Sequence, residues 1–314
     1  GLYASASLEV SRNKIQENLN LLNKKLIFTS GATESNNLAL FGFARNFKQK
    51  TGRYGNILTL KTEHKAVLEP LRQLKKEGFS VTELYPESDG LISEENLINA
   101  LRDDTFLISI MLANNEIGVI QPIEKIFKIC QKNNIKLHTD AAQCLGYVPM
   151  RNFNSLANMI TLSSHKIYGP KGIGLLIIDE DIQLNPLFYG GGQEFGYRSG
   201  TIPLPLIVGF SKAIELAIKN QARNSTHLAS LRDALMNGLL KRNSQILING
   251  SIFHRLPHNL NLTVQDINGP KFHKYIKHQI VCSSGSACSN GSLSHVLTSI
   301  GRSVKEAESS VRLS

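Results

Sequence analysis

Along the first half of the chain, short apolar runs alternate with longer stretches of helical period. Between Lys25 and Ile178 the short runs are rich in β-branched residues, whereas apolar residues in the longer stretches recur every three or four positions. These two periods predict strands and helices, respectively. The predicted strands are Leu26–Ser30, Asn56–Lys61, Phe79–Leu84, Phe106–Leu112, Ile135–Asp140, Met159–Ser163 and Ile173–Ile178, and the clearest helices are Glu34–Phe47, Lys65–Glu77 and Ile123–Asn133. The alternation predicts an α/β fold, in which helices cover both faces of a mostly parallel sheet.

The pattern changes after the three consecutive glycines at positions 190–192. Two long helical stretches follow, and then shorter runs with the character of strands. The helical stretches are Pro205–Ala222 and Leu228–Lys241, and the strand-like runs are Gln245–Ile248, Asn259–Val264 and Gln279–Ser283. We therefore expect a large α/β domain over residues 1–220 and a smaller α+β domain over residues 221–314. Gly1 falls inside a helical pattern and residues 309–314 resemble the start of a strand, so both ends of the chain are expected to be incomplete.

The composition is that of a globular protein that folds without disulfide bonds. Of the 314 residues, 41% are hydrophobic and 19% are charged, which suffices for a full core and excludes a disordered or collagen-like chain. No apolar run approaches the roughly 18 residues that a membrane helix needs. Four cysteines in this length cannot form a disulfide framework, so we expect free thiols in a reducing compartment. A cytoplasmic location follows, with an organelle as the alternative.

The chain carries a formal net charge of +10, from 35 Lys and Arg against 25 Asp and Glu. Such an excess can indicate a nucleic-acid-binding protein. However, the basic residues are dispersed along the chain, and no aromatic motif for base stacking accompanies them. We therefore interpret the charge as a solvated basic surface that attracts an acidic partner or an anionic ligand, and we expect no direct contact with nucleic acid or membrane.

The first predicted strand ends in a segment of small and hydroxyl-bearing residues, Thr29–Asn37, directly before a helix. Small residues let backbone N–H groups approach an anion, and a helix N-terminus favours negative charge. An ordinary N-cap by Thr33 or Ser35 explains the segment about equally well. The fingerprints of dinucleotide and nucleoside triphosphate sites, Gly-x-Gly-x-x-Gly and Gly-Lys-Ser/Thr, are missing from the sequence.

Two further predicted strands end in charged residues. Asp140 closes one apolar strand, where it is either an N-cap or a buried partner for a ring cation. The next strand leads into Ser163–Gly172, where Lys166 follows Ser-Ser-His in a turn rich in Gly and Pro. We expect this turn to hold Lys166 and partly desolvate it, which favours the neutral amine that forms a Schiff base. A reactive lysine, an acid for a pyridinium nitrogen and a cradle for a phosphate are together what pyridoxal phosphate requires.

Of the four cysteines, Cys288 has the surroundings of a reactive thiol. It lies in a run of small residues between Cys282 and Gly291, whereas Cys282 ends an apolar run and is expected to pack as a small hydrophobic residue. The spacing of the two cysteines does not match a zinc site, and we expect no resident metal. By itself this loop is a weak signal, because most isolated cysteines are structural.

Taken together, these motifs resemble the pyridoxal-phosphate-dependent cysteine desulfurases of the NifS/IscS group, which are class V aminotransferase-like enzymes of fold type I. The resemblance covers essentially the whole chain and rests on seven ordered motifs. The motifs are Phe28–Asn37, Lys61–Val67, Asn114–Gln121, Asp140–Gln143, Ser163–Gly174, Gly190–Thr201 and Ser283–Cys288. The Ser-Ser-Gly-Ser-Ala-Cys sequence that ends at Cys288 points to this group rather than to SufS-type enzymes. The resemblance implies a three-layer α/β/α PLP-transferase large domain with a mixed, mostly parallel sheet, plus a smaller α+β domain.

The resemblance also implies a cofactor site around Lys166. Lys166 would bind pyridoxal phosphate as a Schiff base, and Asp140 would keep the pyridine nitrogen protonated. His64 would stack on the ring and assist proton transfers, and Gln143 would hydrogen-bond the ring hydroxyl. The residues that would bind the phosphate are Ala32, Thr33, Ser163, His165 and, from a second subunit, Thr201.

The same resemblance implies a substrate site for L-cysteine. Asn115, next to the cofactor, and Arg312 would hold the substrate carboxylate. The thiolate of Cys288 would attack the substrate sulfur, which releases L-alanine and leaves a persulfide on Cys288. The sulfur would then pass to iron–sulfur scaffold or thiolation proteins, for iron–sulfur cluster assembly or tRNA thiolation. Cys288 is also the residue that would transiently ligate an iron–sulfur cluster.

A homodimer is expected, because Thr201 has a cofactor-binding role only if it completes the neighbour's site. A local turn at Thr201 is the alternative. Two other functions stay open for the chain itself. One is a selenocysteine lyase, an aminotransferase or a kynureninase relative, which products other than alanine from cysteine would favour. The other is an inactive homologue that acts as a binding protein, which the absence of a bound, coloured cofactor would favour.

Overall fold

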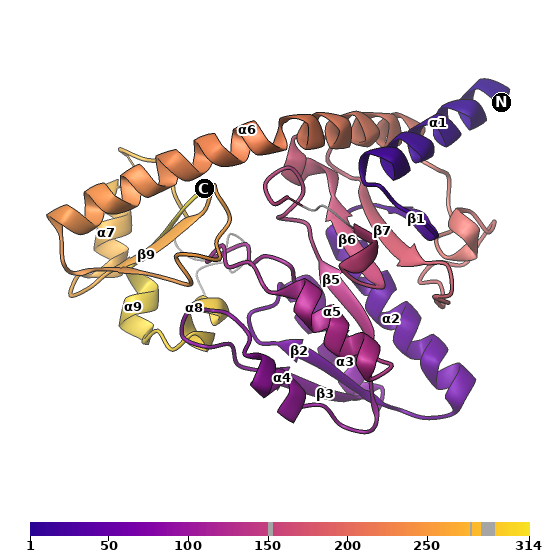
Figure 1. Cartoon of the computed structure of the whole chain (residues 1–314), viewed down its shortest axis with the longest axis horizontal. Helices are drawn as coiled ribbons and strands as arrows, with labels where there is room; N and C mark the ends of the chain where they lie inside the picture. Colours follow the sequence, from indigo (N-terminus) through magenta and orange to yellow (C-terminus); the bar gives the residue numbers. More distant parts are fainter. Residues whose placement is uncertain (150–152, 277, 284–292) are drawn as a thin grey trace.

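The computed structural model describes residues 1–149, 153–276, 278–283 and 293–314. A large α/β part and a smaller α+β part lie side by side, and the long helix α6 (Leu204–Arg242) runs along the top of both (Figure 1). The N-terminus lies on the large part and the C-terminus on the small part (Figure 1). The predicted domain boundary between residues 220 and 221 falls inside α6.

The large part is built on a seven-stranded sheet with the order β1-β7-β6-β5-β4-β2-β3. The pairs β2–β3, β2–β4, β4–β5 and β5–β6 are parallel, whereas β7 runs antiparallel to β1 and to β6. The strands are β1 (Lys24–Thr29), β2 (Asn56–Leu60), β3 (Ser80–Leu84), β4 (Thr105–Ser109), β5 (Lys136–Asp140), β6 (Met159–Ser163) and β7 (Gly174–Asp179). Each lies where the sequence predicts a strand, and the prediction of a mixed, mostly parallel sheet is confirmed.

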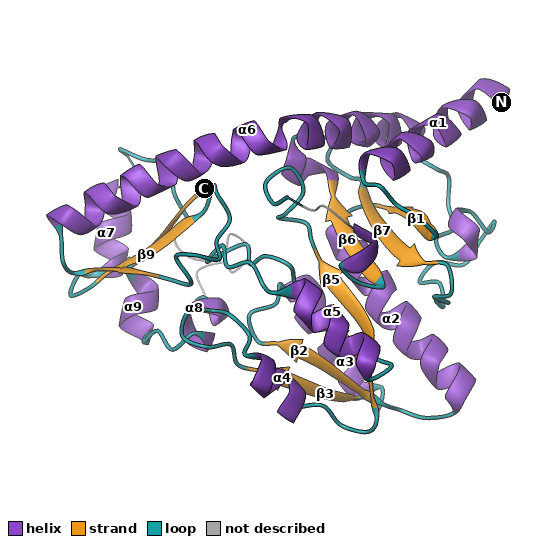
Figure 2. Cartoon of the chain, viewed as in Figure 1, coloured by secondary structure: helices purple, strands orange, loops and turns teal. Residues whose placement is uncertain are grey.

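Helices cover both faces of this sheet, as predicted (Figure 2). On one face α2 and α3 enclose a cluster that includes Leu38, Leu107 and Leu176. On the other face α1, α4, α5 and the first half of α6 enclose a cluster that includes Ile108 and Phe210. Burial on both faces explains why β2 and β4 are nearly continuous apolar runs. These helices are α1 (Leu2–Asn18), α2 (Ala32–Thr51), α3 (Lys65–Lys76), α4 (Glu94–Asn99) and α5 (Ile123–Lys132).

The small part contains an antiparallel sheet with the order β10-β9-β8, packed against α7 and the end of α6. The predicted strands at 245–248 and 259–264 are confirmed, and Cys282 packs half-buried against this cluster as expected. The predicted strand at 279–283 is wrong: Ser283 alone forms an isolated bridge, and the side chain of Val281 is fully exposed. An apolar run with no sheet face to cover gains little by becoming a strand. The elements are β8 (Ile246–Ile248), β9 (Leu260–Val264), β10 (Ser310–Leu313), α7 (Gly269–Ile276), α8 (His295–Ser299) and α9 (Val304–Glu308).

The two helices predicted over 205–222 and 228–241 form a single helix, α6. The residues between them contain neither Gly nor Pro, so no backbone constraint ends the helix there. A free serine hydroxyl competes for the hydrogen bonds of the helical backbone. The hydroxyl of Ser225 instead donates to the carbonyl of Tyr147 at 2.6 Å. The small part is therefore carried on a continuous helical extension of the large part.

The two parts also meet at a loop that follows β4. Val119 forms an isolated bridge with Arg255, and the side-chain amide of Asn261 donates to the carbonyl of Glu116 at 3.0 Å. Gly118 has φ +72°, and a Cβ there would lie 2.5 Å from the Asn259 side-chain oxygen. The loop is thus fixed to the small part at the same place where it presents Asn115 to the large part.

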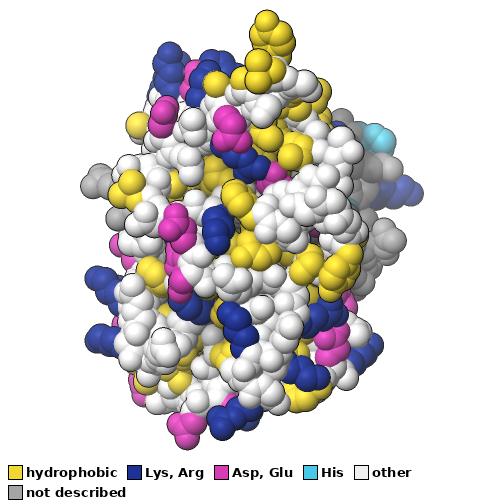
Figure 3. Space-filling model, turned by 90° about the vertical axis from the view of Figure 1, so that its right-hand side faces the viewer, with side chains coloured by type: hydrophobic (Ala, Val, Ile, Leu, Met, Phe, Trp, Pro, Cys, Tyr) yellow, Lys and Arg dark blue, Asp and Glu magenta, His cyan; other side chains and the backbone are white. Residues whose placement is uncertain are grey.

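One face of the molecule shows how the charged side chains are distributed. On the face shown in Figure 3, Lys and Arg side chains are interspersed with Asp and Glu rather than gathered in one patch. Within the described ranges, no helix has the length and apolar character that a membrane crossing requires.

Candidate active site

A cavity of about 590 Å³ lies at the carboxyl ends of the parallel strands, where β10 of the small part approaches the large sheet. Its size is typical of ligand pockets, and its place is where open α/β sheets bind ligands. It brings together residues predicted from five separate motifs. The predicted residues that line it are Ala32, Thr33, His64, Asn115, Asp140, Gln143, Ser163, His165, Lys166 and Arg312.

Two predicted residues are not among those that line this cavity. Thr201 does not line this cavity, and it is exposed on the surface of the chain. Cys288 lies outside the described residues. The cavity is also lined by residues for which we predicted no role from the sequence. Some of them, such as Ser30, Gly31 and Gly172, belong to the motifs described above. The additional lining residues are Ser30, Gly31, Glu34, Ala66, Met111, Ala142, Lys171 and Gly172.

Helix α2 presents an uncapped N-terminus at one end of the cavity. Its N-cap is Gly31, and no side chain accepts a hydrogen bond from its first turn, so the alternative N-cap by Thr33 or Ser35 does not occur. The free backbone N–H groups and the positive end of the helix dipole favour an anion. The hydroxyl of Ser163, 3.0 Å from Nδ1 of His165, adds a polar group at the same end.

The first turn of α2 is also linked to the segment that carries Thr201. Arg198 donates from Nε to Glu34 at 2.9 Å, and the other oxygen of Glu34 accepts the backbone N–H of Ser30 at 2.8 Å. Burial alone would raise the pKa of Glu34, but the hydrogen bonds from Arg198 and Ser30 outweigh it and lower this pKa. Glu34 is therefore a neutralised anion that does not oppose a phosphate at the helix end.

Asp140 is a buried carboxylate that faces the cavity from the end of β5. It is 7% exposed, and turns rather than a helix follow it, so it is not an N-cap. One carboxylate oxygen accepts the side-chain amide of Asn36 at 2.7 Å, and the other accepts the backbone N–H of Ala142 at 3.0 Å. A buried carboxylate held in this way is suited to pair with a cation in the cavity.

His64 enters the cavity as a neutral ring of defined tautomer. It is the N-cap of α3, and its Nδ1 accepts the backbone N–H of Ala66 at 3.0 Å, which places the ring proton on Nε2. Burial is the main cause that lowers the pKa of His64; the charge of Asp140 opposes this shift and that of Lys166 adds to it. Protonation of Nδ1 would also break the cap of α3.

Lys166 lies in a short 3-10 helix, Ser164–Ile167, which ends at Tyr168 in a left-handed conformation with φ 62°. The turn holds the lysine as predicted, but the side chain is exposed, so the predicted desolvation is wrong for the single chain. Tyr168, at the end of this turn, is also exposed. Burial, followed by the charges of Lys166 and Lys171, lowers the pKa of His165, which keeps this imidazole neutral beside the two lysines.

Arg312 reaches the cavity from β10. Its Nη1 donates to the carbonyl of Asn115 at 3.1 Å, whereas its buried Nε has no hydrogen-bond partner among the described residues. A half-buried guanidinium with an unused, buried donor suits a carboxylate. The predicted pair of Asn115 and Arg312 is thus in direct contact across the two parts of the molecule.

The segment that contains Cys288 is attached beside this cavity at both ends. Ser283 exchanges backbone hydrogen bonds of 2.8 and 3.1 Å with Arg312. At the other end Ser294 donates to the buried carboxyl of Glu116, and Nε2 of His295 lies 2.9 Å from the carbonyl of Glu63. Cys288 follows Ser283 by five residues in the sequence, and five residues of fully extended chain reach at most about 18 Å.

Glu63, next to His64, is a fully buried carboxyl that sequence reasoning missed. One oxygen accepts the backbone N–H of Met111 at 2.7 Å, and within the described residues the other has no hydrogen-bond partner. Burial raises the pKa of Glu63 well above its usual range, and the charge of Asp140 adds to this effect. The hydrogen bond to Met111 joins the β2–α3 turn to the end of β4.

Replacing Glu63 by Gln is expected to stabilise the protein at neutral pH. In the wild-type protein burial raises the pKa of Glu63, so the native carboxyl keeps its proton at pH values at which the unfolded chain has released it. The free energy of unfolding therefore falls as the pH rises through and beyond the ordinary carboxyl pKa. Gln keeps the acceptor for Met111 and cannot ionise. Urea unfolding of the two proteins at acidic and neutral pH tests this, and a gap that does not widen toward neutral pH contradicts it. Glu63→Leu, which strands the Met111 N–H, should instead lose about 1–3 kcal/mol.

The residues of the cavity fit pyridoxal phosphate. The uncapped end of α2 suits a phosphate, Asp140 suits a protonated ring nitrogen, and Lys166 supplies an amine for the aldehyde. The backbone itself is shaped for close approach: a Cβ on Gly174, at the start of β7, would lie 2.6 Å from the backbone of Gly31.

A Gly174→Ala substitution is expected to weaken both folding and cofactor binding. The added methyl forces the Ser30–Gly31 turn away from the sheet, which should cost about 1–3 kcal/mol of stability and displace the N-terminus of α2. Unfolding of the apo protein and titration with pyridoxal phosphate measure the two effects. Gly238→Ala is the matched control, because its Cβ meets a single flexible arginine tip at 3.7 Å within α6. Wild-type cofactor affinity in Gly174→Ala would contradict the expectation.

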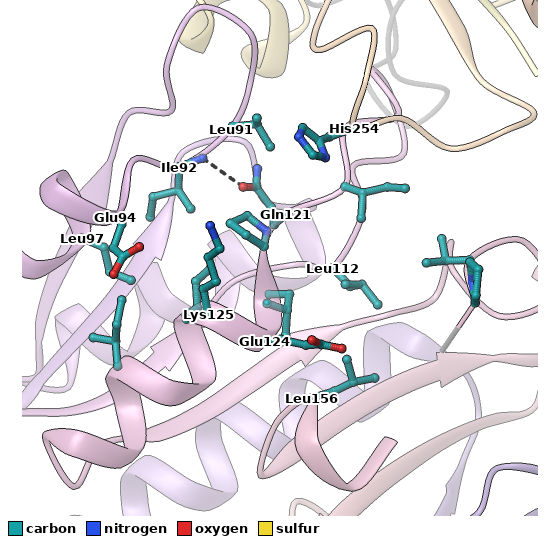
Figure 4. A pocket seen from close by; sticks show the side chains of 17 residues that line it. Leu91, Ile92, Glu94, Leu97, Leu112, Gln121, Glu124, Lys125, Leu156 and His254 are labelled. Carbon is teal, nitrogen blue, oxygen red and sulfur yellow. Dashed lines mark hydrogen bonds between the residues drawn. The ribbon is translucent and has the colours of Figure 1, made fainter. Parts of the chain in front are cut away.

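A second cavity, of about 540 Å³, lies between α4, α5 and the loop after β4 (Figure 4). Its lining is largely aliphatic. Gln121, its central polar residue, accepts the backbone N–H of Ile92 at 3.0 Å and donates to the carbonyl of Gly90 at 2.7 Å, so its amide is already satisfied. In the described part of the chain, no three His, Cys, Asp or Glu side chains gather to hold a metal. The cavity around Lys166 is therefore the candidate active site.

Comparison with known proteins gives relatives over the full length. The family model for aminotransferase class V matches residues 1–314. The chain is 45% identical to the cysteine desulfurase IscS of Pasteurella multocida, with 99% of this chain and 77% of that protein covered. Among solved structures it is similar to a NifS-like protein, with TM-score 0.91, 34% identity and coverage of 100% and 83%. It is also similar to SspA in complex with cysteine, with TM-score 0.84, 36% identity and coverage of 99% and 87%.

Proposed function

The chain belongs to the cysteine desulfurases of the class V aminotransferase family, and we propose that the cavity at the ends of its parallel strands is where this activity resides. It is a pyridoxal-phosphate-dependent enzyme that takes sulfur from L-cysteine and releases L-alanine. The observation that supports the location is the convergence of Lys166, Asp140, Arg312 and the uncapped end of α2 on one cavity.

Each wall of the cavity has a distinct task. When bound, pyridoxal phosphate supplies an aldehyde that joins amines and a protonated ring that withdraws electrons. Lys166 would provide the amine that holds the cofactor, and Asp140 would hold a proton at the ring nitrogen. The end of α2, with Thr33, Ser163 and His165, would bind the phosphate. His64, a neutral imidazole with its proton on Nε2, would face the ring, and Gln143 would bind the ring hydroxyl.

The substrate would be bound at the Arg312 end of the cavity. Arg312 binds the carboxylate of L-cysteine through the donors that Asn115 leaves free. The thiolate of Cys288 attacks the substrate sulfur: an S–S bond forms, the C–S bond breaks, and its electron pair stays on the fragment that leaves as alanine after protonation. A persulfide remains on Cys288. The attachment of residue 283 to Arg312 supports this step, because it starts the segment at the substrate end of the cavity.

The enzyme works as a homodimer in this proposal and delivers its sulfur to other proteins. Thr201 of each subunit completes the phosphate site of the other, which agrees with its exposure and its absence from the cavity of its own chain. The acceptors are scaffold proteins for iron–sulfur clusters or tRNA thiolation proteins. We place the enzyme in the cytoplasm, and cell fractionation distinguishes this from an organelle.

The test is the stoichiometry of the products. Protein loaded with pyridoxal phosphate and given L-cysteine with a thiol reductant should form alanine and sulfide in equal amounts. Equal or faster turnover of selenocysteine or kynurenine, or pyruvate in place of alanine, would contradict the assignment. Sedimentation of the loaded protein tests the dimer independently of its activity.

A further inference from the structure

Asn36 lies one turn into α2, completely buried behind the cavity. Its side-chain nitrogen donates to Asp140 at 2.7 Å, whereas its side-chain oxygen is buried and has no hydrogen-bond partner among the described residues. A buried amide with an unsatisfied oxygen is unfavourable for the fold. Within the described part of the chain, the side chain of Asn36 bonds Asp140 alone.

The direction of that bond is fixed by charge. An ionised carboxylate only accepts hydrogen bonds, so the NH₂ group of Asn36 must face it and the amide oxygen must point away. Only a protonated Asp140 would favour the reversed amide. With Ala142 on the other oxygen, each carboxylate oxygen has one donor from the chain, which fixes the plane of the carboxylate. Titratable groups around Asp140 include Glu63, His64 and Cys144.

We propose that Asn36 is a positioning residue that holds Asp140 ionised and oriented, and thereby keeps the proton of the Asp140–cofactor pair on the ring nitrogen. This rests on the proposed function. Without the Asn36 donor the carboxylate is a stronger base and its plane is free to turn. The carboxyl then competes with the ring nitrogen for the shared proton, and the ring withdraws electrons less strongly.

The test is the protonation of the ring nitrogen in bound pyridoxal phosphate that is labelled there with ¹⁵N. In wild type the ¹⁵N shift should be that of a protonated ring. In Asn36→Leu, which keeps the approximate volume and removes the donor, the shift should move toward that of a neutral pyridine. Turnover should fall about tenfold to a hundredfold, as expected for loss of a charged hydrogen bond. A wild-type shift in bound Asn36→Leu protein overturns the proposal.

Asn36→Asp provides a rescue that keeps the shape and decides the question if the leucine variant fails to fold. In its protonated form the new carboxyl donates the same bond to Asp140, so the ¹⁵N shift should match wild type in acidic buffer. As the pH rises, the ¹⁵N shift of Asn36→Asp should depart from the wild-type value, because the new carboxyl beside Asp140 then ionises. Wild type lacks this ionisation, since it has no second carboxyl there to share one proton with Asp140. An ¹⁵N shift that already differs from wild type in acidic buffer overturns the proposal.

Asn56→Leu is the matched control. Asn56 is equally buried, but its amide bonds Thr105 at 3.0 Å and Thr82 at 2.9 Å at the opposite end of β2. This substitution should lower the melting temperature without changing the ¹⁵N shift. A changed ¹⁵N shift in Asn56→Leu would show that general destabilisation alone is enough to alter the shift. The ¹⁵N comparison needs bound cofactor but no turnover. An inactive wild type with a protonated ring would therefore refute the desulfurase assignment alone, whereas a wild type that binds no cofactor overturns both.

Discussion

Replacement of Lys166 by Ala is expected to reduce cysteine desulfuration on the order of a thousandfold or more, the scale of losing a group that reacts directly. In the proposed site Lys166 would supply the amine that holds the cofactor, and its short 3-10 helix places it in the lining of the cavity. The variant should also lose the yellow colour of a lysine-bound cofactor. Alanine release and visible absorption of the reconstituted protein measure the two effects.

The control for this experiment is Lys61→Ala. The Lys61 amine donates to the hydroxyl of Tyr85 at 2.7 Å and does not line the cavity, so turnover should stay within about twofold of wild type. Lys171 is the other lysine at the cavity. Substantial turnover in Lys166→Ala, with the cofactor attached to Lys171 instead, would contradict the assignment.

Replacement of Cys288 by Ser should reduce cysteine desulfuration by a similar factor, but it should leave the colour of the bound cofactor unchanged. The hydroxyl is a far weaker nucleophile than a thiolate, so sulfur is not taken up, yet the cofactor should bind and colour the protein as in wild type. Alanine release, together with mass spectrometry of the protein after cysteine is added, should show neither turnover nor a persulfide. The retained colour separates this variant from Lys166→Ala.

The other cysteines provide the control for this second expectation. Cys130 and Cys144 are buried, and burial raises the pKa of Cys130 to about 12 and that of Cys144 well above its usual range, so both thiols stay protonated. Cys282 is half-buried, and burial raises its pKa as well. Cys282→Ser should therefore retain nearly full turnover. A persulfide on Cys282, or full alanine release by Cys288→Ser, would contradict the role of Cys288.

The layers of the fold were predictable because each depends on a local pattern. The strands β1 to β7 are short apolar runs bounded by turns, and the cavity follows from the rule that ligands bind at the carboxyl ends of parallel strands. Asp140 and Lys166 could be named because Asp140 ends one such strand and Lys166 lies in the turn that follows the next one. Arg312 and Asn115 come from distant segments, and their contact depends on how the small part sits against the loop after β4.

The features that sequence reasoning missed depend on tertiary environment. The exposure of Val281 turns a strand-like run into an isolated bridge, and the hydroxyl of Ser225 finds a partner that lets α6 continue. Glu63 and Asn36 lie inside two of the seven motifs. However, nothing in the sequence shows that the carboxyl of Glu63 is buried with a raised pKa, or that the side chain of Asn36 bonds Asp140. The exposure of Lys166 likewise depends on what surrounds its turn in the folded chain.

Everything proposed for the cavity requires the cofactor to be joined to one particular amine. Borohydride treatment of cofactor-loaded protein fixes the cofactor to whichever lysine holds it, and peptide mass mapping then identifies that lysine. The mass of the reduced cofactor is expected on Lys166 and on no other residue. An unmodified Lys166 in fully loaded protein, with the added mass found elsewhere, would contradict it.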